Sequence, residues 1–284
     1  MKNMSEQFSQ SPVIPDKKPQ TPSPESNLSK APTSESMDYM EKLGILREKL
    51  REEIRQEKDK EKKLRLKEKL ISVLQTSLNV LRQDEGWKEK AKESLELSET
   101  IKQWQEFYQE TFRITPDFSK LEIPEKREGF DKLLVIAKGM TPQKLFKKCK
   151  ELFPAEKNTK KDLDKIITSD RHAKKESYAI WVRDRLEADE ELKDFSADEI
   201  KKQGLITETL EERLIQELEY FFRTKDHLDK GSTGTLCAGS RQAVGFVPFV
   251  LWFDGRLKVD CFSAGRHNDY LRPREAVSSA GGGK

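Results

Sequence analysis

The sequence predicts a predominantly helical α+β protein, and three observations carry this prediction. Charged residues make up 37% of the 284 residues and hydrophobic residues 34%, a balance that indicates long solvated helix faces. Leucine and isoleucine recur every seven residues within 38–83, as they do in coiled coils. Glycines and aromatic residues gather in 235–262, which is typical of strands and turns. We expect a disordered tail at 1–36, a long helix or coiled coil at 37–84, a globular domain with a small antiparallel sheet at 87–278 and a flexible end at 279–284.

The first 36 residues hold six of the twelve prolines, set among Ser, Thr, Gln, Lys and Glu. Such a segment cannot bury enough apolar surface to offset the entropy of ordering its chain. We therefore expect an inert tail, and binding by PQTPSPES (19–26) is the alternative.

The heptad pattern within 38–83 predicts self-association. Of the positions that lie seven apart, five of six are apolar in one set and three of six in its companion set. We expect a homo-oligomer formed through the apolar members of the first set, which are Leu43, Leu50, Leu64, Ile71 and Leu78. The polar middle of the pattern leaves two alternatives, a single exposed helix and a helical hairpin that breaks inside QEKDKEKK (56–63).

The first part of the globular domain contains two helix signals and one ambiguous segment. A helix at 87–112 carries an aromatic stripe that we expect in the core, formed by Trp104, Phe107, Tyr108 and Phe112. Thr141 followed by Pro142 predicts the start of a second helix, because threonine caps helices and proline suits their first position. The run FDKLLVIA (130–137) fits either a buried strand or a helix.

Two capping boxes mark further helix starts, Ser196 with Glu199 and Thr209 with Glu212. The second box opens an amphipathic helix with an apolar inner face. Between the two helix signals at 141 and 196, SYAIWVRDRLEADEEL (177–192) predicts a strand that continues as an acidic helix.

VPFVLWFDGRLKVDCF (247–262) predicts a β-hairpin, because Asp-Gly between two apolar runs favours a two-residue turn. Such a turn pairs Phe253 with Arg256 and Trp252 with Leu257. One face of the hairpin is expected in the core and carries Val250, Trp252, Leu257, Val259 and Cys261. The other face is expected to be partly exposed and carries Phe249, Leu251 and Phe253 opposite Arg256, Lys258 and Asp260. Residues 235–238 are expected to add a third strand.

Four segments resemble parts of a bacterial family of hypothetical proteins. They are FDKLLVIAKG (130–139), SYAIWVRDRLEADEEL (177–192), TLCAGSR (235–241) and DYLRPREAVS (269–278). The resemblance covers about 87–278 and leaves out the tail and the heptad segment. It implies one inherited unit with variable N-terminal extensions, and it implies no catalytic residues.

The residues that would carry catalysis lie just before the hairpin. Cys237, Ser240, Arg241 and His267 form the candidate set, because a cysteine nucleophile needs a nearby base or cation to become a thiolate. The simpler interpretation of Cys237 is a buried thiol in a strand. The sequence thus favours a non-enzymatic protein, with an enzyme of unknown reaction as the alternative.

Neither a metal nor a cofactor is predicted. The three cysteines and three histidines are scattered without a short ligand spacing, and no glycine-rich phosphate motif occurs.

Nucleic acid is the best-supported partner on charge. Residues 144–175 contain ten lysines and one arginine against five acidic residues, a local net charge of +6 in a chain of +3. Lysines at this density can follow a phosphate backbone, although a solvated helix face and loop is the simpler interpretation. The binding candidates are Lys147, Lys148, Lys150, Lys160, Lys161, Lys174 and Lys175. A smaller cluster surrounds Tyr270 and comprises Arg266, Arg272 and Arg274.

These observations favour a cytoplasmic binding or scaffold protein that self-associates and engages protein or nucleic acid. The cysteine count is odd and contains no CxxC pair, which fits a reducing compartment. The absence of an 18-residue apolar stretch predicts that no membrane is involved. The first residues also lack the apolar core of a secretion signal.

Overall fold

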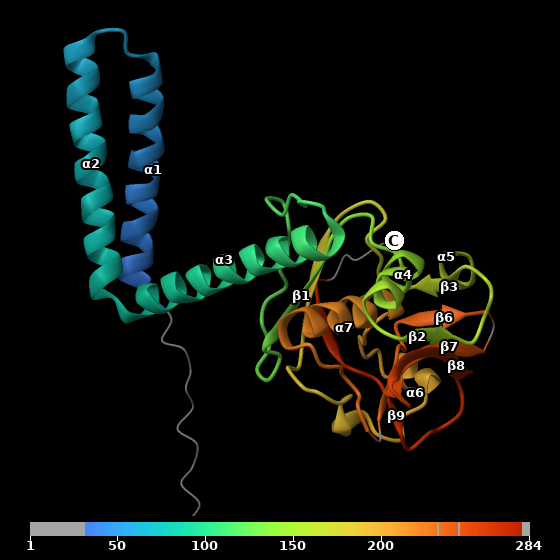
Figure 1. Cartoon of the computed structure of the whole chain (residues 1–284). Helices are drawn as coiled ribbons and strands as arrows, with labels where there is room; N and C mark the ends of the chain where they lie inside the picture. The colour runs from blue at the N-terminus through green and yellow to red at the C-terminus, as the bar shows by residue number, and fades with distance from the viewer. Residues whose placement is uncertain (1–31, 232, 244, 280–284) are drawn as a thin grey trace, which may run out of the picture. The chain divides into compact units, whose positions relative to one another are not determined.

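The computed structural model describes residues 32–231, 233–243 and 245–279 (Figure 1). Helices account for 46% of these residues and strands for 19%, so the fold is mixed α+β rather than predominantly helical. The chain forms two compact units, which divide after Glu93. Most of the predicted tail and all but the first residue of the predicted flexible end lie outside the described residues. None of the described helices is long and apolar enough to cross a membrane.

The heptad segment forms a helical hairpin, in the place that the hairpin alternative predicted. Helix α1 (Ser34–Gln56) and helix α2 (Lys60–Gln83) pack against each other, and the chain turns at Glu57–Asp59. Asp59 stabilises the start of α2, because its carboxylate accepts a hydrogen bond from the backbone N–H of Lys62 at 2.9 Å. The turn lies in a run without apolar residues, so a continuous helix through this run would bury no apolar surface.

The hairpin divides the predicted seam between two faces. Leu50 and Val73 are buried between the helices at 2% and 8% exposure. Leu64, Ile71 and Leu78 point away from α1 and are 57%, 54% and 45% exposed.

Helix α3 (Glu85–Phe112) brings the predicted aromatic stripe into the core of the second unit. Trp104 and Tyr108 also anchor the helix by hydrogen bonds. The indole Nε1 of Trp104 donates to the backbone oxygen of Leu133 at 3.1 Å. The hydroxyl of Tyr108 donates to the backbone oxygen of Val135 at 2.8 Å. Both acceptors belong to FDKLLVIA, which forms a strand.

That strand, β1 (Lys132–Ile136), belongs to a three-stranded antiparallel sheet. Its neighbour is β4 (Tyr178–Val182), and β4 also pairs with β10 (Ala276–Ser278). Residues 133–136 are all buried, so both faces of β1 are covered. A strand covered on both faces reads as a continuous apolar run, which is why alternation was absent from the sequence.

The second sheet has seven strands and is larger than the predicted small antiparallel sheet. Its main path runs β2 (Ala155–Lys157), β8 (Arg256–Ser263), β7 (Phe246–Phe253), β5 (Gly234–Leu236) and β9 (Leu271–Arg272). Strand β6 (Ser240–Gln242) joins β7 to β3 (Ile167–Ser169). The pairs β2–β8 and β5–β9 are parallel, so the sheet is mixed.

The central hairpin β7–β8 has the predicted register. Phe253 lies opposite Arg256 and Trp252 opposite Leu257. Asp254 and Gly255 adopt the positive φ values of 53° and 69° that the turn requires. The predicted third strand is present as β5.

Helix α7 (Leu210–Thr224) contacts β1 of the small sheet and β7 of the large one, so it joins the two sheets. Thr209 and Glu212 form the predicted capping box at its start. Helix α4 (Pro142–Leu152) packs on α7, and the short α5 (Leu163–Ile166) packs on α4. On the opposite face of the large sheet, α6 (Ala197–Lys202), which begins at the other predicted capping box, contributes to a smaller core cluster.

The acidic helix predicted after β4 does not form. Only a single 3-10 turn, η1 (Glu190–Leu192), occurs in this segment. Ion pairs hold the segment as an irregular loop instead. Arg183 pairs with Asp189 and Arg185 with Glu191 within the loop, and Glu190 joins the loop to Arg272 of β9.

Candidate functional site

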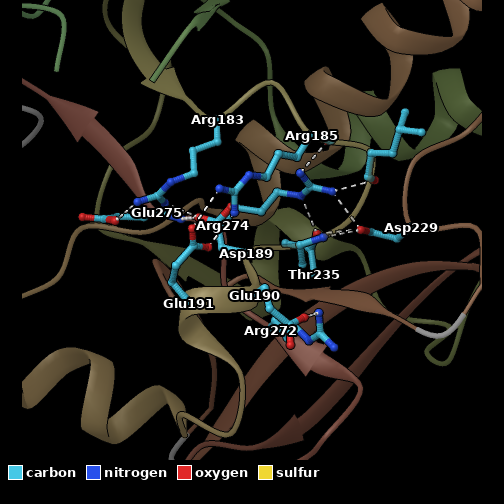
Figure 2. Close-up of polar contacts among 12 residues, drawn as sticks. Arg183, Arg185, Asp189, Glu190, Glu191, Asp229, Thr235, Arg272, Arg274 and Glu275 are labelled. Atoms are coloured by element: carbon cyan, nitrogen blue, oxygen red, sulfur yellow. Dashed lines mark hydrogen bonds and ion pairs between the residues drawn. The ribbon is translucent and has the colours of Figure 1, made fainter. Parts of the chain in front are cut away.

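Two segments of the bacterial resemblance, 177–192 and 269–278, meet in a network of ion pairs (Figure 2). Arg274 lies between β9 of the large sheet and β10 of the small sheet, and its side chain is buried. Its guanidinium donates to the Asp229 carboxylate at 2.8 Å and to the Thr235 hydroxyl at 3.0 Å. It also donates to two backbone oxygens of the loop after β4. Arg274 therefore ties both sheets to this loop.

Asp229 is shared between two arginines. Arg213 of α7 reaches the same carboxylate at 3.0 Å and also pairs with Glu217 at 2.8 Å. Burial opposes the charge of Asp229, but Arg274 and Arg213 hold its pKa below the usual value. The two arginines balance the charges of Asp229 and Glu217, and all four side chains are buried, so the role of this site is to hold the domain together.

A second branch of the network lies nearer the surface. Arg183 donates to Asp189 at 2.6 Å and to Glu275 at 2.8 Å, and Arg127 pairs with Glu275 as well. The Arg127 and Arg183 guanidinium groups lie 4.0 Å and 4.3 Å from the ring centroid of Phe130. This branch fastens the connector before β1 to the segment between β9 and β10.

The catalytic candidates do not share a cavity. Cys237 is fully buried, and burial raises the pKa of its thiol well above the ordinary value. The Ser240 hydroxyl is buried, accepts from the backbone N–H of Leu210 and lies 2.7 Å from the Ser169 hydroxyl. The Arg241 guanidinium donates to backbone oxygens, including that of Ala238 at 2.5 Å.

His267 lies apart from these three residues. Its side chain is 58% exposed, and its Nδ1 lies 2.6 Å from the backbone oxygen of Asp194. The four candidates are thus engaged in structural contacts. The groups whose charges act most on the Cys237 thiol are Glu208 and Arg213, not the predicted Arg241 or His267. Cys261 is half-buried, and burial raises the pKa of its thiol to about 12. Within the described ranges, no group of three or more His, Cys, Asp or Glu residues is arranged to hold a metal.

The large sheet carries a hollow of about 730 Å³ on its outer face. Phe249, Leu251 and Phe253 of β7 line it, on the face opposite to the buried Val250. The smaller core cluster covers the end of this face nearest Phe249 and leaves the rest open. Tyr270 adds a further ring at the edge and is 43% exposed. We name this feature the outer hollow.

Polar groups line the rest of the outer hollow. Glu156 is neutralised by Arg256 at 3.1 Å and by Lys258 at 3.5 Å, and Asp260 accepts from the Asn158 amide at 3.0 Å. Thr233 is 2% exposed, and its hydroxyl has no hydrogen-bond partner among the described residues. The hairpin pattern predicted the open face, whereas Thr233, Asn158 and Glu156 come from segments with no sequence signal for this place.

The predicted lysines gather around α4. Lys147 and Lys150 lie on its exposed face, while Lys160 and Lys161 lie on the β2–α5 loop beside it. The loop is held there because the Gln143 side chain accepts from the backbone N–H of Leu163 at 2.9 Å. The backbone oxygen of Ala173 accepts from Gly139 at 2.7 Å, which places Lys174 and Lys175 near the start of α4.

All of the predicted lysines except Lys148 are exposed, and most of them pair with no carboxylate in the described part of the chain. Lys148 pairs with Glu151, whereas no carboxylate pairs with the other predicted lysines in the described part of the chain. Lys157 extends the group from β2, with its ammonium 5.9 Å from the Phe146 ring of α4. We name the set Lys147, Lys150, Lys157, Lys160, Lys161, Lys174 and Lys175 the lysine surface.

Comparison with known proteins adds no relative. No protein-family model matches the chain, and neither the curated proteins nor the solved structures include a match. The resemblance to bacterial hypothetical proteins stays a hypothesis from sequence.

Proposed function

We propose that this protein is a non-enzymatic cytoplasmic scaffold that self-associates through its helical hairpin and binds nucleic acid through the lysine surface. The observation that carries the proposal is the set of lysines around α4 whose ammonium groups pair with no carboxylate among the described residues. All of them are exposed except Lys157, which is half-buried and donates to the backbone oxygen of Lys161. A solvated helix face in a protein with nearly balanced charges normally places acidic residues among its lysines. Exposed acids such as Glu151 and Asp162 adjoin the lysine surface, but residues 144–175 keep a net charge of +6, so a positive field is available to phosphates.

The structural contacts of the lysine surface support the same partner. The carboxylate of Asp164 accepts from Thr141 at 2.7 Å and from the backbone of Gln143 at 2.8 Å, so this nearby acid is engaged at the start of α4. The free cysteines, Cys149, Cys237 and Cys261, fit the reducing compartment in which a cytoplasmic partner would be met.

Replacing Lys147 and Lys150 by glutamate is expected to weaken nucleic-acid binding at least about tenfold. The slope of the logarithm of affinity against the logarithm of salt concentration should also become shallower, by about 0.7 to 0.9 for each phosphate contact that is lost. Fluorescence anisotropy with a labelled oligonucleotide over a range of salt concentrations measures both quantities. Lys193→Glu, at an exposed lysine elsewhere in the domain, is the matched control. A wild-type slope near zero would contradict the proposal.

The outward face of α2 supports self-association with a second copy. Leu64, Ile71 and Leu78 are exposed and lie seven residues apart, with Ile71 in the middle. An antiparallel pairing centred on Ile71 places Leu64 of each copy opposite Leu78 of the other. A two-fold dimer requires this kind of self-complementary surface. The hairpin also buries little between its own helices, so a second layer would add core to a marginal unit.

Ile71→Glu is expected to convert a dimer to a monomer, because it places two charges at the centre of the paired surface. Analytical ultracentrifugation of the full chain measures the mass. Ser72→Glu introduces the same charge at the neighbouring exposed position and should leave the dimer intact. Circular dichroism checks that both variants keep their helices. Wild-type protein that stays monomeric at high micromolar concentration would refute the dimer.

A further inference from the structure

The outer hollow and the lysine surface meet at the edge strand β2. In β2, Glu156 lies opposite Lys258 of β8, and Lys157 lies opposite the buried Val259. Successive side chains of a strand point to opposite faces. The Glu156 side therefore borders the outer hollow, whereas the Lys157 ammonium reaches toward Phe146 on the α4 side. A bound polymer that extends from the outer hollow across β2 therefore reaches the lysine surface.

The outer hollow offers rings rather than a closed apolar pocket. Phe253 is 55% exposed and Tyr270 43%, so each ring has surface accessible to a planar group, with the Lys258 ammonium over one side of the Phe253 ring. The Lys258 ammonium lies 4.7 Å from the Phe253 ring centroid and holds that ring at the edge of the hollow. A volume of about 730 Å³ falls within the range of small-ligand sites. Exposed aromatic rings beside a row of cations are the features by which proteins hold unpaired bases and their phosphates.

We infer that the ligand of this domain is single-stranded nucleic acid, with bases stacked in the outer hollow and the adjoining phosphates on the lysine surface. The inference rests on the nucleic-acid binding proposed above and adds the form of the ligand. A duplex keeps its bases stacked on one another, so it can use the lysines but not the rings. Of the two carboxylates at the hollow, Glu156 is neutralised by Arg256 and Lys258. Asp260 keeps its negative charge and accepts a hydrogen bond from the Asn158 amide, so a bound strand must hold its phosphates away from Asp260.

The test compares labelled oligothymidylate with a DNA duplex of the same length, using the full-length protein and fluorescence anisotropy. We expect the single strand to bind at least about tenfold more tightly than the duplex. The double variant Phe253→Ala/Tyr270→Ala should lose that preference, because each stacked base contributes enough affinity for a severalfold change. Its duplex affinity should stay at the wild-type value. Oligouridylate in the same assay shows whether RNA serves equally.

Phe246→Ala is the matched control, because Phe246 is 49% exposed at the start of β7 and does not line the outer hollow. Thermal denaturation of each variant checks that the fold is kept, which is expected for exposed rings. Equal affinity for single strand and duplex, unchanged by Phe253→Ala/Tyr270→Ala, would overturn the inference and leave the lysine surface as a general phosphate site. No binding of either nucleic acid would overturn the inference and the proposed nucleic-acid binding together.

Discussion

Arg274→Met is expected to lower the free energy of unfolding by about 3–5 kcal/mol, the cost of leaving a buried charge without its partner. Methionine fills a similar length but cannot neutralise Asp229, which is fully buried. Methionine also cannot donate the hydrogen bonds that Arg274 makes to the Thr235 hydroxyl and to the backbone oxygens of Arg185 and Leu186. Because Arg274 lies between the two sheets, we expect the loss to affect the whole domain rather than one loop.

Urea denaturation followed by circular dichroism measures this loss. Arg256→Met is the matched control, because its ion pair with Glu156 is exposed and such pairs contribute about 0–1 kcal/mol. Arg274→Lys keeps the positive charge but lacks the planar set of N–H donors, so we expect an intermediate loss of unfolding free energy. This variant should stay folded and can be measured even if Arg274→Met does not fold. A loss below about 1 kcal/mol for Arg274→Met would show that Arg213 alone satisfies Asp229.

The local features of this fold could be predicted from the sequence because their causes lie within a few residues. The Asp254–Gly255 turn, the capping boxes at Ser196 and Thr209, and the proline-led start of α4 all depend on side chains next to the backbone they shape. The network around Arg274 joins residues up to 148 positions apart, such as Arg127 and Glu275. Nothing in the local pattern of 183–191 distinguishes carboxylates in a solvated helix from carboxylates held in ion pairs, whether with Arg183 and Arg185 of the same segment or with the distant Arg272.

The heptad segment illustrates a second limit. A repeat of seven specifies which residues share a face but not whether the partner helix comes from the same chain. Leu50 is buried within the hairpin, whereas Ile71 faces outward.

The outer hollow could be predicted only in part, because a sequence pattern shows which residues share a face but not what covers that face. The alternation of β7 placed Leu251 and Phe253 on an open face, but the chain segments that surround this face come from elsewhere in the sequence.

A pH-dependent loss of stability is expected from Glu208, and Glu208→Gln should remove it. Both carboxyl oxygens of Glu208 are buried without a hydrogen-bond partner among the described residues. Burial raises its pKa from 4.5 to about 8, although Arg274 and Arg213 oppose the shift. The folded state thus favours the protonated acid. Its contribution to stability is complete below pH 4.5 and is lost as pH rises toward 8, by on the order of 4 kcal/mol.

Glu208→Gln keeps the shape of the protonated acid and cannot ionise, so the stability difference between variant and wild type should grow in the variant's favour from about pH 5 to pH 8. Urea denaturation at a series of pH values measures that difference. Glu211, whose pKa burial also raises to about 8, leaves a residual slope in the variant. Glu128→Gln, at an exposed position, should run parallel to the wild type. A Glu208→Gln curve that also runs parallel would mean that Arg274 and Arg213 already hold Glu208 as a carboxylate, and the network would then carry one more negative charge at neutral pH.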